Sequence, residues 1–78
     1  MKLIVLNLPR DLGEDDLAIL FRAHGEIKSC DLVLDEKTGT SKGFGFVEMA
    51  FASDAEIAIK ELHGSKINKN KIRVKPAA

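Results

Sequence analysis

The sequence predicts an α+β fold in which a four-stranded antiparallel sheet carries two helices on one of its faces. Four segments alternate apolar and polar residues as strands do, because successive strand side chains point to opposite faces. Two other segments repeat apolar residues at helical spacing, and each lies between two of the strands. The 78 residues are expected to form one domain, residues 1–78, with a thin core.

The first strand is expected at residues 1–7, where Leu3 and Val5 face one way. Pro9 ends it, because proline has no backbone N–H to donate to a sheet. A helix should open at residues 14–16, three acids that are favourable at its positive end. Its apolar face comprises Leu17, Leu20, Phe21 and His24, at positions i, i+3, i+4 and i+7.

The second strand is expected at residues 27–34, and a loop rich in turn formers, residues 35–41, links it to the third strand at residues 43–49. Alternation points Cys30, Leu32 and Leu34 of the second strand inward, and Asp31 and Val33 outward.

The second helix is expected to begin with a capping box, Ser-Asp-Ala-Glu, at residues 53–56. An extended piece at residues 66–67 and a turn at residues 68–69 precede the last strand at residues 71–75. The order is βαββαβ, the ferredoxin-like split arrangement, which leaves one sheet face open. Inward-facing residues of these elements are Ala55, Ala58, Ile59, Leu62, Ile72 and Val74.

The most informative segment is residues 42–49, which read Lys-Gly-Phe-Gly-Phe-Val-Glu-Met. Alternation places both phenylalanines on the face opposite the core. Two aromatic rings with a lysine beside them suit unpaired bases, because every base has a π-face and every nucleotide a phosphate. The core face carries Gly45, Val47 and Met49, and the open face carries Lys42, Phe44, Phe46 and Glu48.

This segment resembles the eight-residue ribonucleoprotein motif of the RNA recognition motif family, K/R-G-F/Y-G/A-F-V-x-F/Y. Seven of the eight positions fit, and Met49 stands where the family has an aromatic residue. Residues 3–8 look like the family's six-residue motif, and residues 35–43 look like its usual lead-in. The small size is similar to that of single-domain RNA-binding proteins of bacteria.

The resemblance implies that the chain binds single-stranded RNA, or single-stranded DNA, on the open face. One base would stack on Phe46, with Phe44 packed against the sugars or a neighbouring base. Lys42 and Arg73 would contact phosphates. Lys75 and the backbone of residues 76–78 would touch base edges as the tail crosses the sheet. The remaining RNA-binding candidates are Lys2, Ile4, Asn7 and Glu48.

Two residues depart from the family pattern. Ile4 stands where the family usually has a second stacking aromatic, and such a platform contributes about 1–3 kcal/mol per base. Asp31 adds a negative charge to the open face. With the aliphatic Leu6 and Val33 on the same face, these departures support an alternative, in which the face binds a protein or a second copy of the chain.

The charge distribution predicts a local basic patch. Residues 1–63 carry 12 acidic and 7 basic side chains, whereas residues 64–78 carry 5 basic and no acidic ones. The zero net charge therefore hides two opposed regions, which gives modest affinity for nucleic acid without a long-range attractive field.

The chain is not expected to be an enzyme or to need a cofactor or a metal. The loop at residues 9–13 lacks the glycine-rich phosphate cradle of acylphosphatases, which share the βαββαβ order. His24 and His63 have no serine or cysteine at an activating spacing. The single cysteine, Cys30, suits a small core residue in a reducing compartment, and no apolar run reaches transmembrane length. A cytoplasmic location and no membrane partner are expected.

Three apolar residues occupy positions that are normally polar: Ile19, Phe51 and Ile57. Isolated exposed apolar residues are common and often have no role. The alternative hypothesis is that some of them form a patch for a weak homodimer or for a protein partner.

Overall fold

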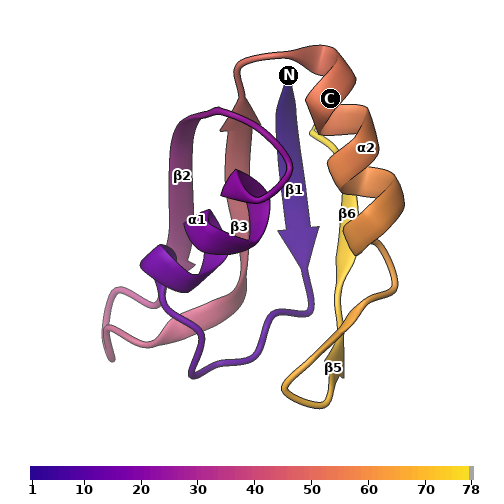
Figure 1. Ribbon diagram of the computed structural model, residues 1–78. Helices are drawn as coiled ribbons and strands as arrows, with labels where there is room; N and C mark the ends of the chain where they lie inside the picture. Colours follow the sequence, from indigo (N-terminus) through magenta and orange to yellow (C-terminus); the bar gives the residue numbers. More distant parts are fainter. Residues whose placement is uncertain (78) are drawn as a thin grey trace.

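The fold, seen in a computed structural model that describes residues 1–77, is a four-stranded antiparallel sheet with both helices on one face (Figure 1). The strand order is β2-β3-β1-β6, and β4 and β5 form a separate hairpin. This confirms the predicted βαββαβ order. The elements are β1 (Lys2–Leu6), α1 (Glu14–Arg22), β2 (Ile27–Leu34), β3 (Ser41–Met49), α2 (Ala52–Leu62), β4 (Lys66–Ile67), β5 (Asn70–Lys71) and β6 (Arg73–Pro76).

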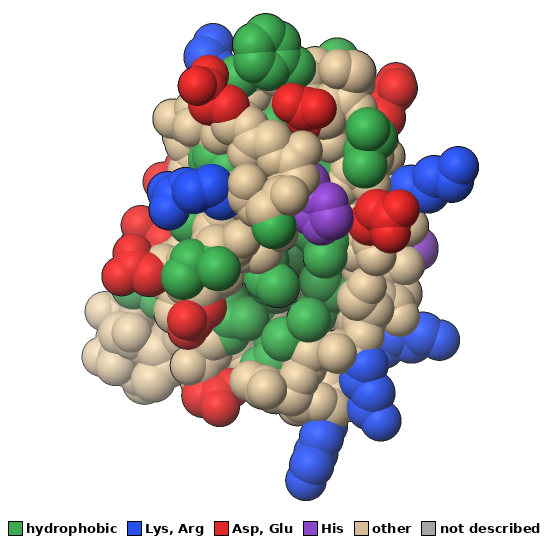
Figure 2. Space-filling view, in the orientation of Figure 1, with side chains coloured by type: hydrophobic (Ala, Val, Ile, Leu, Met, Phe, Trp, Pro, Cys, Tyr) green, Lys and Arg blue, Asp and Glu red, His purple; other side chains and the backbone are tan. Residues whose placement is uncertain are grey.

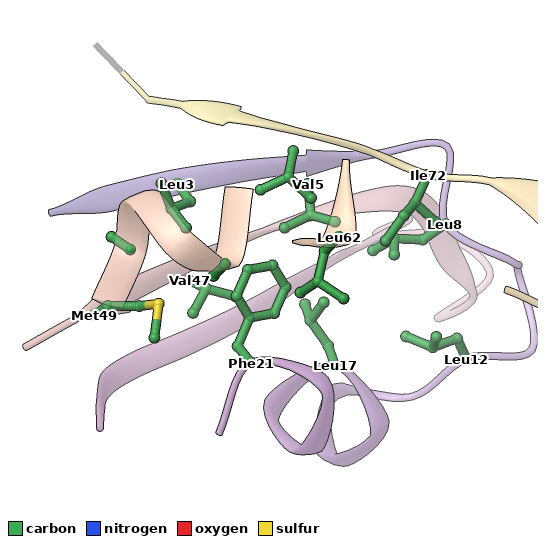
Figure 3. Close-up of a cluster of buried hydrophobic side chains, with 13 residues drawn as sticks. Leu3, Val5, Leu8, Leu12, Leu17, Phe21, Val47, Met49, Leu62 and Ile72 are labelled. Atoms are coloured by element: carbon green, nitrogen blue, oxygen red, sulfur yellow. The ribbon is translucent and has the colours of Figure 1, made fainter. Parts of the chain in front are cut away.

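The core fills the space between the sheet and the two helices (Figure 3). Leu3 and Val5 of β1 are fully buried, as are Val47 and Met49 of β3, so the predicted alternation is confirmed. Full burial of such a side chain contributes about 1.5–3 kcal/mol. The other core residues are Leu8, Leu12, Leu17, Phe21, Ala55, Ala58, Leu62, Ile72 and Val74.

The end of β2 departs from the predicted alternation. Its register against β3 shifts between Leu32 and Leu34, as at a β-bulge. Two steps along β2, from Leu32 to Leu34, stand against four along β3, from Gly45 to Ser41, so the regular pairing that sets the facing of side chains is lost there. Leu34 is 50% exposed rather than inward. The inward prediction for Leu34 was wrong.

The start of α2 also differs from the prediction. The N-cap is Phe51, which makes no side-chain capping bond, and the helix begins at Ala52. Ser53 therefore lies inside the first turn, and the predicted capping box is wrong. The backbone N–H of Ala55 donates to the Phe51 carbonyl at 3.1 Å and closes this turn. The predicted buried face of the helix is confirmed, with Ile59 half-buried beside three buried residues.

The chain after α2 forms the predicted turn, and the last strand, β6, spans Arg73–Pro76 rather than residues 71–75, because Lys71 belongs to the β4–β5 hairpin. Asn68 and Lys69 both have positive φ angles, 45° and 78°, as a tight hairpin turn requires. The tail then continues alongside β1, where the Ala77 N–H donates to the Lys2 carbonyl at 2.9 Å. Up to residue 77 it therefore does not cross the sheet, contrary to the prediction, and residue 78 lies outside the described residues. No helix within residues 1–77 is long and apolar enough to cross a membrane.

Candidate nucleic-acid interface

Phe44 and Phe46 lie side by side on the helix-free face of the sheet. Their ring centroids are 6.2 Å apart and the ring planes are 83° apart, an edge-to-face arrangement that aromatic rings favour. Both side chains are half-buried, and neither belongs to or packs against the core cluster. The predicted aromatic platform is therefore present, with no helix above it.

A lysine side chain lies over one of the two rings. Lys2 Nζ is 5.2 Å from the centroid of the Phe46 ring, at the distance of a cation–π contact. Such a contact contributes about 0.5–1 kcal/mol at an exposed site. The contact places a positive charge directly beside the aromatic platform.

One row of residues crosses the open face at the level of Phe46. Phe46 is the partner of Asp31 on one side and of Ile4 on the other, and Ile4 is the partner of Lys75. Strands are spaced by about 4.8 Å, so about 14 Å separates the acid from the lysine. The face is therefore acidic at the β2 side and basic at the β6 side.

A hollow of about 500 Å³ lies at the end of the platform, beside Phe44. Three cationic side chains and no acidic one line it, so the hollow is electropositive, a charge that suits an anionic group. Lys42 and Arg73 were predicted from the sequence, whereas Arg10 and Asn70 were not. The lining residues are Leu6, Asn7, Leu8, Arg10, Lys42, Gly43, Phe44, Asn70 and Arg73.

Gly43 allows Arg10 to reach this hollow. Its φ angle is +86°, and a Cβ atom would lie 3.3 Å from Arg10 Nε and 3.4 Å from the Leu8 carbonyl oxygen. Arg10 Nη1 donates to the Ser41 carbonyl at 3.2 Å, which holds the guanidinium across the start of β3. The first glycine of the motif is therefore required by the backbone angle and by the close approach of the loop before α1.

Asn7 has a structural role at the rim of the same hollow. Its Nδ2 donates to the Lys71 carbonyl at 2.9 Å, and Asn70 Nδ2 donates back to the Asn7 carbonyl at 3.3 Å. These bonds fasten the β4–β5 hairpin to the end of β1. The side-chain amide nitrogen of Asn7, one of the RNA-binding candidates, is therefore already bonded within the chain. Glu48, the other predicted polar contact, is half-buried opposite Lys2.

Two titratable side chains, Cys30 and Asp35, have shifted pKa values. Burial raises the pKa of the Cys30 thiol to about 11, and the nearby Glu14 and Asp31 carboxylates add to the shift, so little of the thiol is ionised near neutral pH. The N–H groups of Thr38 and Lys37 donate to the Asp35 carboxylate and lower its pKa. Within residues 1–77, no cluster of three or more side chains could hold a metal ion.

Comparison with protein families gives a match over residues 3–73 to the RNA recognition motif. Among curated proteins, the chain is 42% identical over 72 residues to a Sex-lethal homolog of Chrysomya rufifacies, covering 92% of this chain and 24% of that protein. It spans less than a quarter of the curated relatives it matches. The single-domain bacterial type expected from size is not supported by these relatives.

Two solved structures have nearly the same fold. RNA recognition domains 1 and 2 of Sex-lethal from Drosophila melanogaster give a TM-score of 0.95 at 39% identity, covering 99% of this chain and 49% of that one. A Sxl-lethal protein/RNA complex gives a TM-score of 0.94 at 39% identity, with 99% and 46% covered. The second structure contains RNA bound to a protein similar to this chain.

Proposed function

This chain belongs to the RNA recognition motif family, and on that premise we propose that it binds single-stranded RNA on the open face of its sheet. The observation that carries the proposal is the pair of adjacent rings, Phe44 and Phe46, outside the core and free of any helix. The match to a Sxl-lethal protein/RNA complex supports it.

Stacking holds the bases in this mechanism. One base lies on Phe46 after displacing Lys2, and Phe44 packs against the adjoining sugars or the next base. Because every base has a π-face, this contact tolerates any sequence and any single strand, single-stranded DNA included. Asp31, the partner of Phe46 across β2, accepts hydrogen bonds from base N–H groups and can add preference.

Charge sets the path of the RNA backbone. Phosphates avoid the acidic β2 side and lie over the β6 side, near Lys75 and Arg73. The backbone then enters the hollow beside Phe44, where Arg10 and Lys42 stand with Arg73. Contacts from Lys42, Arg73 and Lys75 give a log–log salt slope of about −2, and a fourth from Arg10 brings it to about −3.

The test is RNA affinity of the double variant Phe44→Ala plus Phe46→Ala, measured by fluorescence anisotropy with a short unstructured RNA. Loss of both rings should cost about 2–6 kcal/mol at 1–3 kcal/mol per base, without change of fold in circular dichroism. Affinity equal to that of the unmodified chain would rule out stacking. Ile57→Ala, on the exposed side of α2, is the matched control.

The alternative in which the open face binds a protein is not favoured, because the solved relative cited above binds RNA and the cationic hollow adjoins the rings. RNA binding and protein binding by this face are distinguished by whether removing its rings weakens RNA affinity, so the double variant tests both hypotheses.

A further inference from the structure

A second hollow lies on the helical face, on the opposite side of the sheet from the rings. Its volume is about 320 Å³, within the range of pockets that hold small ligands or side chains. Apolar surface is open between the helices on this face (Figure 2). We call the hollow the α1 groove; it is lined by Asp11, Leu12, Asp16, Ile19, Leu20, Ile67 and Asn68.

The floor of the α1 groove is continuous with the core. Leu12 is 6% exposed, and Leu20 and Ile67 are half-buried against the core cluster. Ile19 stands at the border and is 61% exposed, on a helical position where a polar residue is usual. Of the three unexpected apolar residues, Ile19, Phe51 and Ile57, only Ile19 lines this groove. Its exposure is therefore part of a continuous apolar surface and not isolated.

The charge beside the α1 groove is negative. Asp11 and Asp16 line it, and the exposed Asp15 lies one helical turn before Ile19. Three carboxylates outweigh the roughly +0.5 charge of the helix N-terminus. The Gly13 N–H donates to Asp16 Oδ2 at 3.1 Å and orients that carboxylate. A ligand must therefore be apolar where it enters and positively charged beside that point.

No lysine or arginine is among the residues that line the α1 groove, so the negative charge of its aspartates is not neutralised by a lining residue. Lys66 and Lys69 flank the hairpin residues that line it, but neither lysine is itself a lining residue. Figure 2 shows acidic side chains gathered along the left of the apolar surface and lysine or arginine side chains at its lower right.

Size distinguishes a short segment from a second folded copy. Seven residues line the α1 groove, whereas a stable interface between two proteins uses about 20–30 residues on each side. We propose that the α1 groove binds a short segment of another protein, in which an apolar side chain is flanked by lysine or arginine. Because the groove and the rings lie on opposite faces, the segment and RNA bind at the same time.

The test uses a short synthetic peptide with a leucine pair between arginines, titrated into the ¹⁵N-labelled chain and followed by NMR. Amide signals of Ile19, Leu20 and Ile67 should shift, while those of Phe44 and Phe46 stay in place. A peptide with glutamates in place of the arginines, and one with alanines in place of the leucines, should bind at least fivefold more weakly, and added salt should weaken the binding.

Ile19→Lys should lower peptide affinity about tenfold or more without unfolding the chain, since this side chain is 61% exposed. Ile57→Lys is the matched control, an isoleucine 51% exposed on α2 that does not line the groove, and it should leave affinity unchanged. Both variants should bind RNA normally.

Four results would overturn the proposal. They are groove signals that do not move with the basic peptide, equal binding of the acidic peptide, equal loss in both lysine variants, and groove signals that shift on concentrating the chain alone. The last result would assign the groove to a second copy.

Discussion

Replacing Ile4 by phenylalanine should turn a weak part of the RNA surface into a second stacking platform. Ile4 is the direct cross-strand partner of Phe46, and residues paired in this way have Cβ atoms about 4.5–5.5 Å apart. A ring at this position therefore stands next to the existing one on the open face. The side chain of Ile4 is only half-buried and outside the core, so the larger ring displaces no core residue.

The expected gain follows from what isoleucine lacks. A base on an aromatic ring contributes about 1–3 kcal/mol, and the apolar surface of Ile4 already supplies part of this. The Ile4→Phe variant should therefore gain about 1–2 kcal/mol, or roughly 5- to 30-fold in affinity. An aromatic cross-strand pair adds about 0.2–1 kcal/mol to the sheet, so the fold should be no less stable.

Fluorescence anisotropy with one short unstructured RNA, at several salt concentrations, measures the effect. The salt slope should stay the same because no charge is changed. Ile57→Phe makes the same substitution on the helical face and should not alter affinity. An Ile4→Phe variant that binds no more tightly, or whose salt slope changes while its intercept does not, would refute the claim that bases stack at this row of the sheet.

Three further outcomes are expected. Gly45→Ala should lower the free energy of unfolding by about 1–3 kcal/mol in urea denaturation, because the new Cβ would lie 2.7 Å from the Asp31 carbonyl oxygen; an unchanged midpoint would contradict this. Cys30, with a pKa raised from 9.0 to about 11, should react about 100-fold more slowly with a thiol reagent near pH 8 than an exposed cysteine, and equal rates would contradict its burial. The pKa of Asp35, followed by carbonyl NMR, should lie below the usual value of about 3.9. Because the folded-state pKa is lowered, the hydrogen bonds to this carboxylate stabilise the loop at pH values above the unfolded-state pKa, and this stabilisation is lost as the pH falls through the folded-state pKa. A measured pKa at or above about 3.9 would contradict these bonds.

Alternation and helical spacing were sufficient to predict the sheet, both helices and the two faces of β3. They failed where local backbone geometry decides the outcome. The irregularity beside Leu34 has its extra residues in β3, between Ser41 and Gly45, so alternation along β2 alone does not signal it. At α2, the helix begins at Ala52 without a side-chain cap, before the Ser53 that matched the capping pattern.

In the candidate site, too, residues in regular strands could be predicted from the sequence, whereas residues in loops and turns could not. The faces of the residues in β3 and β6 could be predicted because alternation fixes the side of the sheet on which each side chain lies. Arg10 comes from a loop and Asn70 from a hairpin, and their positions depend on contacts between distant parts of the sequence. Arg10 bonds to Ser41, 31 residues away, and Asn70 bonds to Asn7, 63 residues away. The sequence shows only that residue 43 is glycine, and the structure explains this glycine by its φ of +86° and by the space it leaves for the Arg10 guanidinium.

The most direct test of the central claim is an NMR titration of the labelled chain with random-sequence single-stranded RNA. The ring signals of Phe44 and Phe46 should move first and furthest, with Lys2 and Arg10 following, while α1 and α2 stay unperturbed. Ring signals that remain fixed while other parts of the chain respond to the RNA would contradict base stacking on the open sheet.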